Sequence, residues 1–87
     1  MNHRVTAHTD YVEIQQSETE IVQKVSALIK NRREELGVSQ VMLSKLSGID
    51  RAYISRLERG MKPGFTFGII AKLFTALKIK FKEIDNL

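Results

Sequence analysis

The stretch of sequence that decides the fold is residues 39–60, which read SQVMLSKLSGIDRAYISRLERG. Ser39 and Asp50 are residue types that cap the start of a helix, because their side-chain oxygens accept a hydrogen bond from a free backbone N–H group. Gly48 and Gly60 suit the left-handed conformation that commonly ends a helix. The order of caps and glycines therefore predicts two short helices joined by a tight turn.

The two expected helices span about residues 40–46 and residues 51–58. A pair this short must cross at a wide angle, which requires a small residue where the backbones approach and a glycine at the turn; Ser44 and Gly48 fill these places. The pair also needs apolar anchors, which occur at intervals of six, five and three residues: Leu43, Ile49, Ile54 and Leu57. We therefore expect a helix-turn-helix unit packed into a larger helical domain.

A longer helix is expected before this unit. Ser17-Glu18-Thr19-Glu20 has the form of a capping box, in which the serine hydroxyl accepts a backbone N–H and the last glutamate reaches back. From there an apolar stripe at helical spacing runs toward Gly37, which is expected to end the helix. Residues 1–16 show no helical period, so we interpret them as a flexible or loosely docked arm before a domain at 17–87.

Two more helices are expected after the unit. Thr66 is a suitable cap for a helix whose apolar face is broad, and a last short helix is expected from Phe81 to Asn86. The face of the first of these comprises Phe67, Ile70, Ala71, Phe74 and Leu77. No segment has the alternation that predicts a strand with assurance. The expected fold is therefore all-α, with five helices.

The charge of the chain is unevenly distributed. Residues 1–20 hold one basic and four acidic side chains, for a net charge of −3, whereas residues 21–87 hold thirteen basic and six acidic ones, for a net charge of +7. A domain this basic favours a polyanionic partner, although ribosomal and membrane-surface proteins share the property. The sequence shows no cysteine, apolar span or signal peptide, so we expect a soluble, cytoplasmic protein.

In these features the chain resembles the Cro and phage-repressor type of helix-turn-helix protein, often called the XRE family. The resemblance covers about residues 21–84, and its most specific parts are the Ser39-Gln40 opening, the Gly48-Ile49 turn and the ISRLERG ending at 54–60. It implies a five-helix, lambda-repressor-like domain that binds duplex DNA.

Two positions depart from the family pattern. Met42 stands where the family often has a glutamate that caps the second helix, and Lys78 stands where a glycine often ends the fourth helix. Neither position belongs to the expected DNA-binding face. The departures therefore affect the expected helix ends and not the expected function.

The resemblance assigns base readout to the second helix of the unit, which in this motif enters the major groove with its N-terminal residues at the base edges. Arg51 and Arg56 are our candidates because arginine can pair with the O6 and N7 atoms of guanine, and Ala52 is small enough to touch a thymine methyl. The expected contacts to the DNA backbone, among them a glutamine like the family's phosphate-binding one, are Gln40, Lys45, Tyr53, Ser55, Arg59 and Lys62.

The resemblance also implies a structural ion pair. The family places an acid near the end of the recognition helix that pairs with an arginine of the first helix, and Glu58 and Arg33 occupy these places. We expect this pair to orient the helices rather than to read bases. The neighbouring Arg32 is expected to be solvated or close to a DNA phosphate.

Apolar residues near the C-terminus exceed what the core of a small monomer is expected to bury. An exposed apolar cluster marks an interaction site, and in the family the C-terminal helices commonly meet across a two-fold axis. We therefore expect a homodimer whose interface comprises Leu73, Ile79, Phe81, Ile84 and Leu87. The phenylalanines, Phe65, Phe67, Phe74 and Phe81, are expected in the core or at this interface rather than around a ligand.

Regulation of transcription is the function that these observations favour. We expect a repressor that binds a palindromic operator as a homodimer, although the sequence does not decide between repression and activation. The alternative is an antitoxin that binds a toxin protein and also controls its own operon. In that setting the acidic, poorly patterned residues 1–16 would fold on the partner.

Catalysis and metal binding have no support in the sequence. Ser39, Ser44 and Ser55 have no histidine and acid arranged around them for nucleophilic attack. His3 and His8 lie in the expected arm, without the spacing or rigidity of a metal site. We therefore expect no enzyme activity, no cofactor and no metal.

Overall fold

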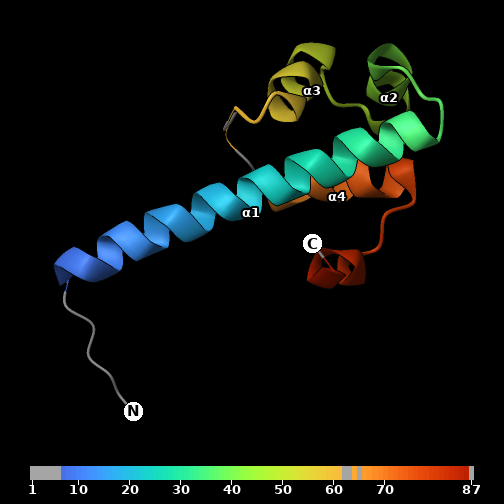
Figure 1. Cartoon of the computed structure of the whole chain (residues 1–87). Coiled ribbons are helices and arrows are strands. Elements are labelled where there is room, and N and C mark those ends of the chain that lie inside the picture. The colour runs from blue at the N-terminus through green and yellow to red at the C-terminus, as the bar shows by residue number, and fades with distance from the viewer. Residues whose placement is uncertain (1–6, 62–63, 65, 87) are drawn as a thin grey trace.

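The fold is known from a computed structural model that describes residues 7–61, 64 and 66–86. Within these ranges the chain forms four α-helices and one 3-10 helix, and no strand (Figure 1). The helices are α1 (Ala7–Glu35), α2 (Gln40–Ser47), α3 (Arg51–Glu58), α4 (Phe67–Leu77) and the 3-10 helix η1 (Phe81–Asn86). The expected all-α fold is therefore confirmed, with the last helix in the 3-10 form.

The helices pack around α1 and α4. Both α2 and α3 lie on one side of α1, η1 lies on the opposite side, and α4 runs alongside α1 (Figure 1). Contacts join α4 to α1 and α2, and α3 to α1 and α2. This arrangement holds the short α2–α3 pair on a helical base, with the outer faces of both short helices free.

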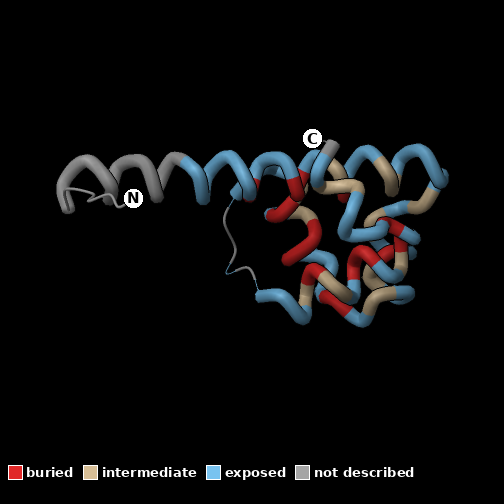
Figure 2. Tube along the Cα trace, turned by 90° about the horizontal axis from the view of Figure 1, so that it is seen from below, coloured by how far each residue is buried: buried red, intermediate tan, exposed pale blue. Residues whose placement is uncertain are grey.

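The core lies where these helices face one another (Figure 2). All four apolar anchors expected for the helix-turn-helix unit are buried, which confirms that part of the sequence analysis. The side chains with almost no exposed surface are Ile29, Leu43, Ile54, Leu57, Leu73 and Leu77. Since these residues come from α1 to α4, the unit cannot form its core without the other two helices.

The expected caps form as local hydrogen bonds. Ser39 accepts the backbone N–H of Met42 at 3.0 Å, and Asp50 accepts that of Ala52 at 3.1 Å. The hydroxyl of Thr66 likewise accepts the N–H of Ile69 at 3.1 Å. The starts of α2, α3 and α4 are thus confirmed.

The expected start of the first helix is wrong. The helix begins at Ala7 and runs unbroken through the capping-box sequence 17–20, whose side chains are exposed. Residues 7–16 contain no proline or glycine that would interrupt a helix, so a cap-like sequence in its middle does not start a new one. Residues 1–6 lie outside the described residues, and the division into arm and domain stays a prediction.

Two of the residues expected at a dimer interface, Leu73 and Ile79, lie in the core instead. Leu73 has no exposed surface and Ile79 is 6% exposed, because both belong to the core of the single chain. Phe81 is exposed and Ile84 is partly buried against the core, so both remain available, while Leu87 lies outside the described residues. The helical period correctly located one apolar face of α4. It did not show that α1 and α2, which both contact α4, bury more of the helix than this face.

The sequence analysis expected Arg32 to be solvated or close to a DNA phosphate. The structure instead places its side chain in contacts within the protein. Its guanidinium donates to the carbonyl oxygen of Lys78 at 3.1 Å and forms an ion pair with Glu83 of η1. Glu83 also accepts the backbone N–H of Lys80 at 2.9 Å. This hydrogen bond lowers the pKa of the Glu83 carboxyl, burial opposes the change, and the hydrogen bond from Arg32 and its charge lower the pKa further. Arg32 therefore ties η1 and the end of α4 to α1.

The chain turns sharply after α4 at Lys78, which has a φ of +58° and a ψ of +35°. This left-handed conformation is the one that a glycine usually supplies at a helix end. The departure from the family pattern at this position therefore leaves the end of α4 unchanged. None of the helices in the described part of the chain is long and apolar enough to span a membrane.

Candidate nucleic-acid interface

The helix α3 has one buried and one exposed face. Tyr53, Ile54 and Leu57 point into the core, and the exposed face carries Arg51, Ala52, Arg56 and the adjoining Arg59. At about 100° per residue, Arg51 and Arg56 lie about 140° apart around the helix. They therefore stand at the two margins of one exposed face rather than in a single line.

The turn between α2 and α3 is fixed by hydrogen bonds from two serines. Ser44 donates its hydroxyl to the carbonyl of Ile49 at 2.6 Å, and Ser47 donates to the carbonyl of Leu43 at 2.7 Å. The Ser47 hydroxyl also accepts the N–H of Ile49 at 3.1 Å. These contacts hold α3 at its angle to α2.

Gly48 is needed in this turn for its backbone conformation. It has a φ of +76°, and a Cβ added there would meet no atom within 4 Å. The left-handed helix end that the sequence analysis expected at this glycine is therefore confirmed. A side chain would fit the space but would strain the left-handed backbone.

Arg33 and Glu58, the pair that the family resemblance implies, form a bidentate ion pair between α1 and α3. The Nε and Nη2 atoms of Arg33 donate to the two carboxylate oxygens at 2.7 and 2.9 Å, and Nη1 donates to the carbonyl of Val38 at 2.8 Å. The Glu58 side chain is only 4% exposed. The hydrogen bond to Glu58 raises the pKa of Arg33, although burial opposes the rise.

Gln40 extends this ion pair to the N-terminal end of α3. Its Nε2 donates to Glu58 at 3.0 Å, and its Oε1 accepts a hydrogen bond from Nη1 of Arg51 at 3.3 Å. Because one end of the amide is held by Glu58, the other end presents its oxygen to Arg51. A continuous set of contacts thus links α1, the end of α3, the start of α2 and the start of α3.

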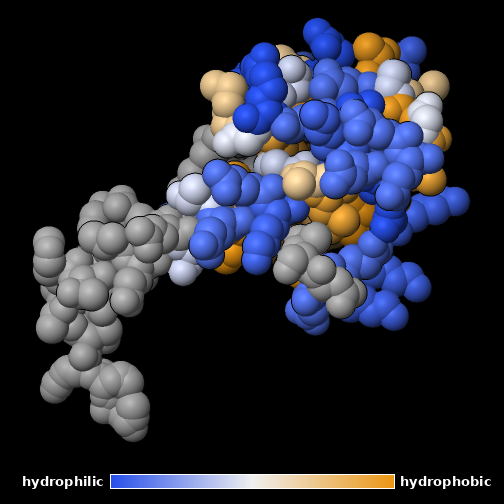
Figure 3. Space-filling model, in the orientation of Figure 1, coloured by the Kyte–Doolittle hydropathy of each residue, from blue (hydrophilic) through white to orange (hydrophobic). Residues whose placement is uncertain are grey.

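The remaining residues expected to contact the DNA backbone divide into three groups. Lys45 and Arg59 are exposed and Ser55 is half-buried, all on the helix-turn-helix unit. Lys62 lies outside the described residues. Hydrophilic side chains cover most of the surface over α2 and α3 in the view of Figure 3.

Tyr53 does not lie on the exposed face of α3, where the sequence analysis expected it to contact the DNA backbone. It is 9% exposed, belongs to the core, and donates its hydroxyl to the carbonyl of Gly64 at 3.5 Å. Burial raises the pKa of the Tyr53 hydroxyl. We therefore withdraw Tyr53 from the expected DNA contacts.

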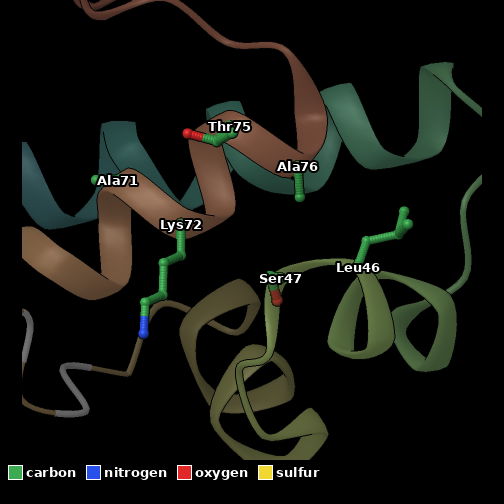
Figure 4. Close-up of a pocket in the computed structure, with 6 residues that line it drawn as sticks. All are labelled: Leu46, Ser47, Ala71, Lys72, Thr75 and Ala76. Carbon is green, nitrogen blue, oxygen red and sulfur yellow. The ribbon is translucent and has the colours of Figure 1, made fainter.

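A shallow groove of about 290 Å³ lies between α2 and α4. Figure 4 shows its lining: Leu46 and Ser47 come from α2, and Ala71, Lys72, Thr75 and Ala76 come from α4. Lys72 is the one charged residue in this lining, and the Ser47 hydroxyl is already engaged by the backbone. In the described parts of the chain no group of three or more potential metal ligands is found.

Sequence reasoning missed two of these contacts. Arg32 and Glu83 are 51 positions apart, so no local pattern connects them. The contact between Gln40 and Arg51 joins the first residues of two successive helices. Predicting the contact between Gln40 and Arg51 would have required the crossing angle of α2 and α3, which the sequence does not give directly.

The fold and this surface define a helix-turn-helix protein that presents an arginine-bearing helix. A family model described as helix-turn-helix matches residues 29–84. The chain belongs to this family, the XRE type of DNA-binding transcription regulators, which are generally not enzymes. The search of curated proteins found no match for the chain.

Proposed function

We propose that this DNA-binding regulator is a repressor that binds a palindromic operator as a homodimer, with α3 in the major groove. The observation that carries the proposal is the contact between Gln40 and Arg51, which orients an exposed arginine at the N-terminal end of α3. That end approaches the base edges in this motif. A bound dimer that overlaps a promoter would exclude the polymerase.

The proposed roles follow from exposure and position. Arg51 and Arg56 read bases and Ala52 lies against a thymine methyl, since all three are exposed on α3. The proposed contacts to phosphate are Gln40, Lys45, Ser55, Arg59 and Lys62. Gln40 has a second amide hydrogen besides the one given to Glu58, so it can serve the ion-pair network and a phosphate together.

The first test is the salt dependence of binding to duplex DNA. Each neutralised phosphate contributes about −0.9 to the slope of log K against log salt, so a dimer with several lysine and arginine contacts is expected to give about −4 to −8. Fluorescence anisotropy between low and moderate salt measures this slope. A slope of zero would remove the DNA-binding assignment for these residues.

The second test separates base readout from phosphate binding. An operator selected from random duplexes is titrated with Arg51→Ala and Arg56→Ala, and each variant is expected to lose about 1–3 kcal/mol and to relax preference at one base position. Lys62→Ala is expected to weaken binding to all sequences alike. Lys24→Ala, which removes an exposed lysine of α1, is the control. Base preferences unchanged in both arginine variants would contradict the readout assignment.

The proposed homodimer matches the geometry of the proposed palindrome. Two recognition helices reach successive major grooves on one side of the duplex when they lie about 34 Å apart and are related by a two-fold axis. The proposed interface comprises Phe81 and Ile84, together with Leu87, which was expected there from the sequence and lies outside the described residues. Phe81→Asp with Ile84→Asp is expected to abolish binding to the palindrome and to leave at most weak half-site binding.

A second candidate function is that of an antitoxin. It is favoured by the first part of α1, which extends beyond the other helices and offers a surface to a partner protein (Figure 1). Co-expression with the product of the neighbouring gene, followed by purification of the pair, tests this candidate. A stoichiometric complex that inhibits a toxic activity would support the antitoxin, and independent purification of both proteins would remove it.

A further inference from the structure

The first half of α1 extends away from the core. The helix begins at Ala7, but its first buried side chain among those described is Val22. The fifteen residues before Val22 extend for about 22 Å at a rise of 1.5 Å per residue. Most of the stability of helices in proteins comes from packing of an apolar face against other parts of the structure, so we expect this part of α1 to pack against another surface.

An apolar groove begins where α1 leaves the core. Its volume is about 310 Å³, and α1, α4 and η1 each contribute to its lining. Three of the side chains around it are largely exposed: Phe67 at 72%, Ile21 at 57% and Phe81 at 48%. The Phe67 and Phe81 rings stack with centroids 5.3 Å apart, and so form a flat apolar wall.

The extending helix and the part of the groove margin beside Phe81 carry opposite charges. Residues 7–20 contain four acidic residues and no lysine or arginine. In contrast, the groove residue Phe81 lies between the exposed Lys80 and Lys82. The other groove residue of η1, Ile84, lies between Glu83, which is paired with Arg32, and the exposed Asp85, so the positive charge is at the Phe81 end of the groove. The extending segment and the Phe81 end of the groove are therefore complementary in charge, and both are parts of the same chain.

We propose that the groove formed by Ile21, Phe67 and Phe81 is occupied by the first half of α1 from a second copy of the chain. The two α1 helices run antiparallel, so that each copy places its acidic segment over the groove of the other and beside Lys80 and Lys82. This inference rests on the proposed homodimer and extends its interface from η1 to α1 and the start of α4.

The arrangement is compatible with binding a palindrome. In each chain α2 and α3 lie on one side of α1 and η1 lies on the other (Figure 1). A two-fold axis perpendicular to the antiparallel α1 pair can therefore direct both α3 helices to the same face of the dimer. The groove is used twice under this symmetry, so both apolar surfaces are covered in one closed assembly.

The test measures self-association of the full chain by sedimentation at micromolar concentrations. Phe67→Asp is expected to raise the dimer dissociation constant at least about 30-fold, as for an aromatic residue at the centre of an interface. The matched control is Leu46→Asp, which changes a leucine that is 58% exposed at the groove between α2 and α4. Since both parent side chains are exposed, both variants are expected to keep the circular dichroism of the wild type.

The outcomes separate this inference from the proposed function. A wild type that stays monomeric at all concentrations, and also on operator DNA, would contradict both the homodimer and the groove occupant. A wild-type dimer with an unchanged dissociation constant in Phe67→Asp would leave the homodimer intact and overturn the groove as its interface. Dissociation of the Leu46→Asp variant alone would place the interface at the other groove.

A charge exchange identifies the segment that occupies the groove. Lys80→Glu with Lys82→Glu is expected to weaken the dimer at low salt, and the further changes Glu13→Lys and Glu20→Lys are expected to restore at least about half of the loss in log units. Restoration would show that the acidic segment lies beside the two lysines. If the four-fold variant is no tighter than the lysine variant, the antiparallel packing of α1 is excluded.

Discussion

Removal of the buried ion pair between Arg33 and Glu58 is expected to affect both stability and DNA recognition. Arg33→Met would leave the Glu58 carboxylate with one remaining side-chain donor, the Gln40 amide, at a side chain that is 4% exposed. Breaking a buried pair in this way costs about 3–5 kcal/mol. The Arg33 side chain is 13% exposed, which lets some water reach the site and favours the lower end of this range.

A loss of about 3 kcal/mol is large for a domain of this size, whose core supplies about 3–5 kcal/mol in total. With a urea m-value of about 1 kcal/mol per molar, the unfolding midpoint would fall by about 3 M. Arg33→Met with Glu58→Leu replaces the pair by apolar side chains, and such replacements are often neutral. The double variant is therefore expected to unfold within about 1 M of the wild type.

Urea unfolding followed by circular dichroism provides the four free energies of this double-mutant cycle. If Arg33→Met is unfolded in water, a stabilising osmolyte added to all four proteins brings it into range. The expected coupling energy is at least about 2 kcal/mol. Two single effects that simply add in the double variant would refute the argument that the pair compensates for its own burial.

The double variant also tests the link from the ion pair to Arg51. Without Glu58 the amide of Gln40 is no longer held, so the arginine at the start of α3 loses its fixed acceptor. A folded double variant is therefore expected to bind DNA with weaker base preference at one position. Wild-type preference in this variant would show that Arg51 orients itself without the network.

Three further predictions concern single positions. Gly48→Ala is expected to cost about 1 kcal/mol of stability because φ at this position is +76°. Gly68→Ala is expected to stabilise the protein by about 0.5–1 kcal/mol, because Gly68 lies in α4 without a positive φ or a close neighbour. Urea midpoints that shift in the same direction for both variants would contradict this. Ser26→Ala is expected to raise stability by about 1 kcal/mol in the same assay, because the buried Ser26 hydroxyl has no hydrogen-bond partner in the described structure; a loss of stability would show that the hydroxyl has one. The pKa of Glu83 is lowered on folding from about 4.5, so its contribution is present above that pH and is lost as the pH falls through the folded-state value. Thermal scans should therefore show that the melting temperature falls less between pH 7 and about pH 3.5 in Glu83→Gln than in the control Asp85→Asn. An equal fall in both variants would exclude this role of Glu83.

Features encoded in a few neighbouring residues were predictable from the sequence. The caps at Ser39, Asp50 and Thr66 each depend on a side chain and a backbone N–H two or three residues away. The chain reversal at Gly37 is equally local, since Val38 donates to the carbonyl of Arg33 and the glycine has a φ of +70°. Such signals do not depend on how the helices pack.

Features that depend on packing were not predictable in the same way. The capping-box sequence at 17–20 describes a possible helix start, but only the preceding backbone decides whether the helix begins there. The sequence analysis placed Phe67 on the apolar face of α4 and Leu73 outside it, yet Leu73 is fully buried and Phe67 is 72% exposed. The difference depends on which part of α4 is covered by α1 and α2. The hydrophobic period of a single helix does not carry this information.

The role of Gln40 combines both kinds of information. The family resemblance predicted a phosphate contact for this side chain, and its place at the start of α2 remains suited to one. The hydrogen bonds to Glu58 and Arg51 add that the amide is held from the core side and oriented toward α3. A phosphate bound to its second amide hydrogen would therefore engage a group already fixed by Arg33 through Glu58. The ion pair that stabilises the fold would in this way limit the conformational freedom lost when the regulator binds DNA, which the double-mutant cycle can measure as a change in affinity separate from stability.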